Sequence, residues 1–595
     1  MDNKDINKEL VIPVMHCFND NYAIPASVAF LSMLENANKN YFYKLYVLHS
    51  DITLQNQEIL TSIVSRFKNA SLEFIDMNNK FEDLFEQTNS KGHYTKEMFY
   101  KFCAPSLFPQ YDKIIITDVD VVYCGDISEE FVKFKDDEEN YLAGIRGVMK
   151  KGGHIETMYK QIYSDFTEEE MGACIAGAYD NKFTARDIVE IKEAGGAHFL
   201  ELYHGKTAAF KDMALSILPY LMTTACKKEG ETSKICILTA TSGDTGKAAL
   251  EGFADVPGTE IVVFYPCDGV SQVQERQMIT QEGDNTHVFA IRGNFDDAQT
   301  GVKKIFSDDA FAAKLAARHV KLSSANSINI GRLVPQVAYY VYSYLKLAAD
   351  GMLACGQPMN VVVPTGNFGN ILAAYFAREM GVPIAKLICA SNDNKVLTDF
   401  IRSGAYDIRG EVRKFYCTNS PSMDILISSN LERLLYLLSG RDGALIRDWM
   451  NGLDKDKVYE VNEKVRAGLS DFYGGYCTQE ETLATIGRMW RENHYLMDTH
   501  TAVAYKVYED YRKESGDETP TVIASTASAY KFAESVASAI GIGPCADGFA
   551  YVAALAKETG VPVPYGLAGL DQKPVRHTDV VDAAAMSEAV LEALK

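Results

Sequence analysis

Apolar residues in the first quarter of the chain gather in short runs separated by segments with helical spacing. Strands that alternate with helices imply a parallel sheet whose carboxyl ends carry the ligand loops. We therefore predict an α/β unit over residues 1–148. Its predicted strands are 11–18, 44–50, 71–77 and one within 112–127, and its predicted helices are 24–37 and 96–108.

The rest of the chain repeats one pattern, in which an apolar strand leads through a small-residue loop into a helix. Residues 149–156 show no periodicity and contain two adjacent glycines, so we predict a junction there and a second α/β domain over 157–595. The predicted strands that precede these loops are 198–203, 234–239, 361–364 and 521–525.

Composition narrows the function class. The chain has 595 residues, 47% of them hydrophobic and 23% charged, which is typical of a globular protein of two to four domains. A net charge of −21 argues against nucleic acid and anionic membranes as partners. The twelve cysteines form no CxxC pair, and we find no signal peptide or membrane span, so we expect a cytoplasmic protein.

Lys211 is the first candidate for chemistry. The stretch HFLELYHGKTAAFKDM predicts a strand, a turn and a helix from about residue 209, so Lys211 falls in the first helical turn. The positive end of the helix dipole favours a neutral amine, the form that attacks an aldehyde. An exposed lysine is the ordinary alternative, and on spacing alone it is the more frequent one.

Three further loops follow strands and offer hydrogen-bond donors. The loop 242–245 has donors for an anion at a helix start. The loop 366–370 is a phosphate cradle by the same physics, without the lysine spacing of a nucleotide-binding P-loop. In the fourth unit, Ser525, Thr526 and Ser528 offer neutral hydroxyls, which can bond a pyridine nitrogen without protonating it. Together the four units suit pyridoxal phosphate, with its aldehyde, phosphate and ring nitrogen.

Seven blocks then carry a family resemblance. In order they are LYHGKTAAFKDMA, ATSGDTGKAALEG, FYPCDGVSQVQERQM, GNFDDAQ, SSANSINIGRLVPQ, PTGNFGN and MDTHTAVAY, and over about 155–595 they resemble the threonine synthase family. The resemblance implies a two-subdomain fold-type II architecture, like the tryptophan synthase β subunit. The implied activity is a carbon–oxygen lyase reaction on a phosphate, which converts O-phospho-L-homoserine and water to L-threonine and phosphate.

The resemblance also implies residue roles. Lys211 would be catalytic and would form the Schiff base with the cofactor. The cofactor phosphate would lie on Gly366, Asn367, Phe368, Gly369 and Asn370, and Thr526 would face the ring nitrogen. The substrate carboxylate would face Ser242, Gly243, Asp244 and Thr245, and the substrate phosphate would face Asn326, Ser327, Asn329 and Arg332. A planar guanidinium at Arg332 suits a bidentate phosphate contact.

Two departures from that family stand out. Lys206 occupies the position where the family has proline, which changes the stiffness of the turn before Lys211. The family's N-terminal segment, which packs on the cofactor domain, is replaced by the unit 1–148.

The unit 1–148 resembles the start of family 8 glycosyltransferases. The resemblance rests on VIPVMHCFNDNYAIPASVAFLSML, the predicted helix near Tyr94 to Pro109, and YDKIIITDVDVVYCGDISEEF. It implies nucleotide binding at residues 19–22, and Mn²⁺ and a sugar diphosphate at Asp118 and Asp120. Lys101 stands where that family has arginine, and the resemblance ends near 148, so we predict a truncated GT-A-like half-domain.

Three functions follow as hypotheses. The first is a pyridoxal-phosphate-dependent threonine synthase acting on a small-molecule substrate. The second is a manganese-dependent glycosyltransferase that uses a nucleotide-sugar donor, and the third is an inactive fusion of two gene fragments. The Asp-x-Asp motif without its later partners argues against the second, and the intact lysine with all its loops favours the first over the third.

Overall fold

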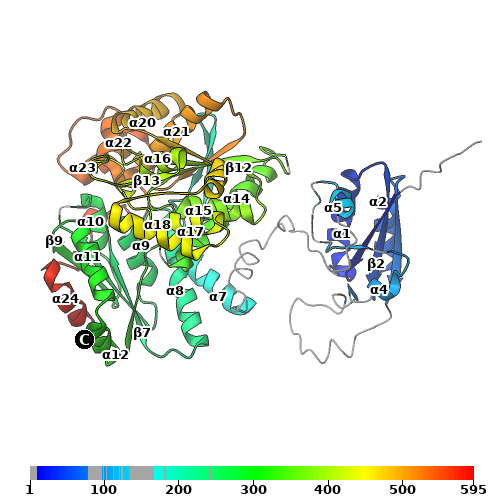
Figure 1. Cartoon of the computed structure of the whole chain (residues 1–595), viewed down its shortest axis with the longest axis horizontal. Coiled ribbons are helices and arrows are strands. Elements are labelled where there is room, and N and C mark those ends of the chain that lie inside the picture. Colours follow the sequence, from blue (N-terminus) through cyan, green and yellow to red (C-terminus); the bar gives the residue numbers. More distant parts are fainter. Residues whose placement is uncertain are drawn as a thin grey trace, which may run out of the picture. The chain divides into compact units, whose positions relative to one another are not determined.

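The computed structural model describes most of the chain (Figure 1). The described residues are 10–77, 97, 100–101, 104–111, 113–119, 121, 123, 125–133, 166–179, 182–241, 243–267, 269–327, 329–354 and 356–595. They divide into two compact units, the first drawn from Met1–His154 and the second from Ile155–Leu353 and Gln357–Lys595. The predicted junction 149–156 and the end of the first predicted domain lie outside the described residues, so these boundaries stay predictions.

The first unit contains a parallel sheet of its own. Its order is β3-β2-β1-β4, and the described strands are β1 (Leu10–Cys17), β2 (Tyr41–His49), β3 (Ala70–Asp76) and β4 (Ile115–Ile116). Its described helices are α1 (Ala23–Glu35), α2 (Leu54–Val64), α4 (Ala104–Leu107) and α5 (Ser128–Lys133), with the 3₁₀ turn η1 (Asp20–Tyr22). The described order of strands and helices confirms the predicted alternation, and β1 and β2 bury apolar residues against α1. Part of the predicted helix 96–108 lies outside the described residues, and the helix described there is α4.

The second unit is built on two sheets. The larger runs β15-β12-β11-β16-β6-β5, from β5 (Glu190–Ala194), β6 (Ala197–Glu201), β11 (Met359–Pro364), β12 (Ile384–Ser391), β15 (Phe472–Tyr476) and β16 (Thr521–Ser525). It is parallel except for the β5–β6 hairpin. The smaller is parallel and runs β10-β7-β8-β9-β17, from β7 (Lys234–Ala240), β8 (Thr259–Pro266), β9 (Thr286–Arg292), β10 (Val320–Ser323) and β17 (Val580–Asp582).

A short antiparallel pair joins β13 (Ala405–Asp407) and β14 (Val458–Glu460). The helices of the second unit are α7 (Glu168–Tyr179), α8 (Lys211–Lys228), α9 (Asp244–Phe253), α10 (Gln272–Ile279), α11 (Phe295–Phe306), α12 (Asp309–Ala316), α13 (Ile330–Leu333), α14 (Pro335–Ala349), α15 (Gly369–Glu379), α16 (Val396–Ser403), α17 (Leu431–Leu438), α18 (Gly443–Asp456), α19 (Glu463–Gly468), α20 (Gln479–Asn493), α21 (Thr499–Ser515), α22 (Ala533–Ala539), α23 (Gly548–Thr559) and α24 (Met586–Ala593). Short 3₁₀ turns are η3 (Pro421–Met423), η4 (Leu469–Asp471), η5 (Ala529–Phe532), η6 (Leu570–Gln572) and η7 (Ala583–Ala585).

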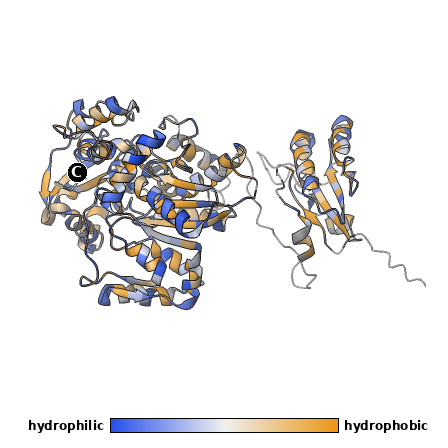
Figure 2. Ribbon diagram, turned by 90° about the horizontal axis from the view of Figure 1, so that it is seen from above, coloured by the Kyte–Doolittle hydropathy of each residue, from blue (hydrophilic) through white to orange (hydrophobic). Residues whose placement is uncertain are grey.

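Apolar strands explain why parallel sheets form. Strands β11 and β16 are buried at every position, as expected when helices cover both faces of a sheet. Figure 2 shows hydrophobic residues concentrated on strands, while the helices carry both hydrophobic and hydrophilic residues. None of the helices in the described ranges has the length and apolar character needed to cross a bilayer.

The four predicted strand–loop–helix units of the second domain are confirmed, with small shifts. The helix expected from about residue 209 begins at Lys211, so this lysine is its first residue. The helix expected after the fourth strand begins with the 3₁₀ turn η5 before α22. Strands β6, β7, β11 and β16 all end at predicted loops, which places the candidate site at the carboxyl ends of both sheets.

Helices α8 and α9, which follow the first two predicted site loops, pack closely against each other (Figure 1). The approach is possible because residue 252 of α9 is glycine. A Cβ atom at Gly252 would lie 2.0 Å from the carbonyl oxygen of Leu215, which is backbone and cannot turn aside.

We therefore predict that Gly252→Ala lowers the free energy of unfolding by about 1–3 kcal/mol, because the added methyl group forces two helices apart. Gly172→Ala is the matched control, since Gly172 is also helical and a Cβ there meets nothing within 4 Å. That control should be neutral or stabilising by up to about 1 kcal/mol. Urea denaturation measures both, and equal effects would contradict this account.

Candidate active site

The backbone around Lys211 is tied to the loop after β16. The Phe210 amide donates to the Thr526 carbonyl over 2.8 Å, and the Ser528 amide donates to the Ala208 carbonyl over 3.1 Å. Strands β6 and β16 are neighbours in the larger sheet. The structure therefore brings the predicted lysine and the predicted hydroxyl loop together.

The side chain of Lys211 is buried and lies among charged groups. Its exposed fraction is 10%, and its Nζ lies 3.6 Å from Asp244 Oδ2 and 4.9 Å from the centre of the Phe210 ring. Burial lowers the pKa of the Lys211 ammonium to about 8; Asp244 opposes this shift, while Arg332 and Lys531 add to it. A neutral amine is thus accessible near physiological pH, as the sequence predicted, but burial is the principal cause.

Asp244 is the carboxylate at the centre of this arrangement. Its Oδ1 accepts from Lys531 Nζ over 2.6 Å and from Gln274 Nε2 over 2.8 Å. Burial by itself would raise the pKa of Asp244, but the charges of Lys531 and Lys211 outweigh it and hold the pKa below its ordinary value. Because carboxylates repel each other, Asp244 is better suited to the lysines than to a substrate carboxylate.

The remaining members of this loop fit an anion better. Gly243 has a φ of 134°, and a Cβ there would lie 2.5 Å from Gln274 Nε2, so glycine is required. Thr245 lies in the first turn of α9, where backbone amides point outward. Ser242 lies outside the described residues.

Arg332 is a buried cation without a carboxylate partner in the described ranges. Its guanidinium donates to the Ala325 carbonyl over 3.0 Å and to Thr245 Oγ1 over 3.4 Å. Burial lowers its pKa to about 10, so the group still carries its charge at neutral pH. Such a cation suits an anionic ligand.

The other residues of the Arg332 loop hold its shape or connect it to the cradle. Asn329 accepts from the Gly331 amide over 3.0 Å and donates to the Ser324 carbonyl over 3.2 Å. The backbone amide of Asn326 donates to Ser324 Oγ over 3.1 Å. Ser327 Oγ accepts from Asn367 over 3.4 Å, which joins this loop to loop 366–370.

Loop 366–370 begins α15 and is braced from outside. Phe368 has a φ of 62°, a left-handed conformation that turns the chain into the helix. Asn430 Nδ2 donates to the Asn367 carbonyl over 2.8 Å, and Ser428 Oγ donates to the Gly366 carbonyl over 2.7 Å. A Cβ at Gly366 would lie 2.8 Å from the Ser422 carbonyl oxygen, so this position needs glycine.

Asn370 supplies the clearest structural sign that this loop suits a ligand. Its Oδ1 accepts from the hydroxyls of Tyr339, over 3.0 Å, and of Tyr340. Its Nδ2 is buried and has no hydrogen-bond partner among the described residues. A buried donor left unpaired is costly, so an acceptor such as a phosphate oxygen fits this cradle.

Sequence reasoning missed Lys531, Gln274 and the bracing segment 428–430. Lys531 is the most consequential, since its side chain is fully buried and contacts Asp244. The available signal was a lysine within the apolar stretch that follows Ser528. In the fourth loop, Thr526 is buried and Ser525 Oγ lies 3.1 Å from Thr501 Oγ1, and the predicted contact with a ring nitrogen stays a prediction.

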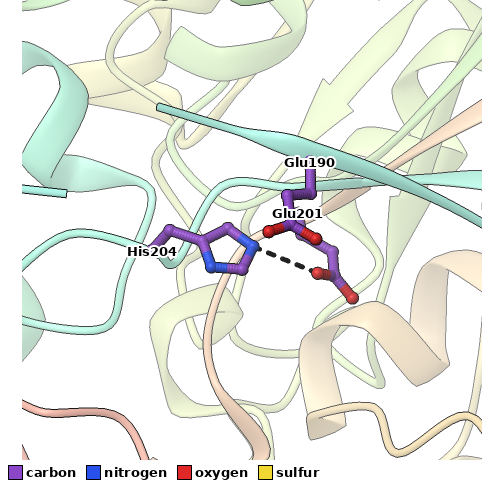
Figure 3. Close-up of side chains that lie close together, drawn as sticks. All are labelled: Glu190, Glu201 and His204. Atoms are coloured by element: carbon purple, nitrogen blue, oxygen red, sulfur yellow. Dashed lines mark hydrogen bonds and ion pairs between the residues drawn. The ribbon is translucent and has the colours of Figure 1, made fainter. Parts of the chain in front are cut away.

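Glu190, Glu201 and His204 form a separate cluster beside β6 (Figure 3). One ligand atom from each lies within 4.8 Å of the others, which is compatible with a metal ion. However, His204 Nε2 already contacts Glu201 over 3.1 Å, and Lys192 pairs with Glu190 at 2.5 Å. These neighbours satisfy the cluster without an ion.

In the first unit, Asp118 lies just after β4, and its carboxylate is half exposed. Lys101 Nζ contacts Asp118 Oδ1 at 2.7 Å. Asp120 lies outside the described residues, so the predicted metal pair stays a prediction. The turn 19–22 is held by Asp20, which accepts from Thr53 and Asn56.

Three family models match the chain. The model described as pyridoxal-phosphate dependent enzyme matches residues 192–527, and the one described as threonine synthase, C-terminal matches residues 501–590. The model described as glycosyl transferase family 8 matches residues 13–174, which extends past the predicted boundary at 148.

Relatives and solved structures agree with the first two models. Threonine synthase-like 1 of Homo sapiens is 41% identical over 423 residues, covering 70% of this chain and 56% of that protein. The chain thus spans about half the length of this relative. Threonine synthase of Saccharomyces cerevisiae is 36% identical over 407 residues, covering 65% of this chain and 75% of that protein.

The crystal structure of a PLP-bound threonine synthase from Brucella melitensis is similar to this chain. The match covers 74% of this chain and 89% of the Brucella chain, with 35% sequence identity and a TM-score of 0.64. The predicted fold-type II architecture is thereby confirmed. Since a family model covers more than half of the sequence, the chain belongs to the pyridoxal-phosphate-dependent enzymes, in the threonine synthase family, and carries a glycosyltransferase family 8 segment before that domain.

Proposed function

We propose that this protein is a threonine synthase that converts O-phospho-L-homoserine and water to L-threonine and phosphate. The observation that carries the proposal is the buried Arg332, which has no carboxylate partner in the described ranges and bonds to Thr245, next to the aspartate that faces Lys211. A buried cation beside a buried reactive amine suits a substrate that carries both a phosphate and an α-amino group. The threonine synthase relatives support the same choice.

The residues present fit pyridoxal phosphate. Lys211 would hold the aldehyde carbon covalently, and Thr526 would face the ring nitrogen. Loop 366–370, with the Asn370 side-chain amide that has no partner among the described residues, would hold the phosphate. When bound, the cofactor supplies an electron-withdrawing ring that accepts the electron pair left by a removed proton.

Lys211 is also the base of the proposed reaction. Its neutral side chain would take the proton from Cα of the bound substrate, and a second deprotonation, at Cβ, would allow phosphate to leave from Cγ. Once phosphate has left, protons would be returned to Cγ and to Cα and water would add at Cβ, which gives threonine and phosphate. An amine with a pKa of about 8 both accepts and returns a proton near neutral pH.

Arg332 and the amides of loop 243–245 would orient the substrate. Arg332 binds the phosphate and stabilises its growing charge as it leaves Cγ. Gly243 and Thr245 offer neutral donors to the carboxylate. Because Lys211, Asp244 and Arg332 are all buried, bulk water is kept from the reacting carbons until the final addition.

The first test removes the amine. We expect Lys211→Ala to lose the visible absorbance band of the bound cofactor and at least a thousandfold in turnover, because alanine forms no bond with the aldehyde and takes no proton. Lys247→Ala is the control, since Lys247 is also buried but pairs with Glu251. Residual turnover of Lys211→Ala within tenfold of the parent would contradict the assignment.

The second test concerns substrate phosphate. Arg332→Gln should lower kcat/KM for phosphohomoserine about 10- to 100-fold, because a charge-assisted contact contributes roughly 1.5–3 kcal/mol. Cofactor absorbance should be retained. The exposed Arg466, changed to Gln, is the control and should leave kcat/KM within twofold. A loss of cofactor binding without a change in kcat/KM of the loaded enzyme would place Arg332 elsewhere.

The third test concerns the first unit, whose loops suit a different ligand. We expect the double variant Asp118→Asn, Asp120→Asn to leave phosphohomoserine turnover unchanged. The parent is also incubated with Mn²⁺ and a nucleotide sugar, and release or transfer of the sugar is measured. Manganese-dependent sugar transfer by the parent, lost in the double variant, would establish the glycosyltransferase hypothesis instead.

A further inference from the structure

Lys531 is a buried lysine to which the proposed reaction gives no role. Its side chain has no exposed surface, and its Nζ lies 2.6 Å from Asp244 Oδ1 and 2.9 Å from the Thr207 carbonyl oxygen. Burying an ammonium group is costly unless a carboxylate and hydrogen-bond acceptors compensate. The fold therefore gives the Lys531 ammonium group two specific partners, Asp244 and Thr207, and both are close to Lys211.

These contacts link three chain segments at the carboxyl ends of the two sheets. Lys531 lies in η5, after β16 of the larger sheet, and Asp244 begins α9, after β7 of the smaller sheet. Thr207 belongs to the turn that precedes Lys211. One ammonium group thus connects both sheets and the turn that positions the reactive lysine.

The two oxygens of Asp244 are unequally engaged. Oδ1 receives Lys531 at 2.6 Å and Gln274 at 2.8 Å, while Oδ2 lies 3.6 Å from Lys211 Nζ. The shorter of the two ion pairs of Asp244 is the one with Lys531, and the ion pair with Lys211 is long and partial. The charged groups that face Lys211 are Asp244 from α9, Arg332 from α13 and Lys531 from η5.

We propose that Lys531 is a positioning residue that engages Asp244 and thereby prevents it from pairing fully with Lys211, which keeps the Lys211 amine available to an aldehyde at neutral pH. The inference rests on the proposed function in taking Lys211 as the amine that captures the cofactor. Once Lys211 is covalently bound, Asp244 and Lys531 remain a neutral pair. The charge of Arg332 is then left for an anionic substrate.

The electrostatics of Lys211 support this geometry. Burial lowers the pKa of Lys211, Asp244 raises it, and Arg332 and Lys531 lower it further. Removing Lys531 should therefore raise the pKa of Lys211, and removing Asp244 should lower it. The opposite directions distinguish an electrostatic role from general damage, which would not reverse sign.

The test measures the initial rate at which the full-length protein, freed of cofactor, binds pyridoxal phosphate between pH 6 and 10. The rate should rise with pH as Lys211 loses its proton, with a midpoint near pH 8 in the parent. Lys531→Met should move the midpoint up by about one pH unit and lower the rate at pH 7 about tenfold. Asp244→Asn should move the midpoint down.

Two further variants complete the test. The double variant Lys531→Met, Asp244→Asn contains neither of these two buried charges. Its midpoint should lie no more than half a pH unit above that of the parent. Lys247→Met is the control, because Lys247 is a buried, ion-paired lysine on the same helix as Asp244. It should leave the midpoint unchanged.

An unchanged midpoint in Lys531→Met, or an upward shift in the double variant, would overturn the inference. If Lys531→Met does not fold, Asp244→Asn and the double variant still decide, since a midpoint above the parent's in either contradicts it. Capture of the cofactor by Lys211→Ala would instead overturn the proposed function.

Discussion

The site depends on one buried carboxylate shared between two buried ammonium groups. Charges removed from water are tolerated only where partners compensate them, and Asp244 provides that compensation for Lys531 and in part for Lys211. The three residues come from α9, η5 and α8, which follow strands of different sheets. This interaction therefore links loops that follow strands of both sheets, beside the amine that we propose to be reactive.

Positive charge exceeds negative charge around this carboxylate, and an excess of buried positive charge suits an anionic ligand. Arg332 keeps its charge without a carboxylate among the described residues, and the unpaired amide of Asn370 adds a neutral donor in the cradle. Buried cations hold anions more strongly than exposed ones, because water does not screen the interaction. In the first unit, by contrast, Lys101 and Asp118 form a partly exposed pair, which contributes roughly 0–1 kcal/mol and is easily exchanged for other partners.

The sequence by itself determined the strand–loop–helix units and most of the residues at their ends. Strand and helix periods are local, so the apolar runs at β6, β7, β11 and β16 could be read directly. Parallel strands of one sheet place their carboxyl ends at one edge, so the loops that carry Lys211, Asn370 and Thr526 could be expected near one another. The family resemblance added the cofactor and the substrate.

Only the tertiary structure decided which charges share the site. Asp244 was expected beside a substrate carboxylate and Lys531 was not considered, yet the two form a fully buried pair. The bracing of loop 366–370 by Ser428 and Asn430 was equally invisible. Such contacts join residues far apart in the chain, and local periodicity carries no information about which distant segments meet. A lysine is usually exposed, so its burial becomes evident only when the packing around it is known.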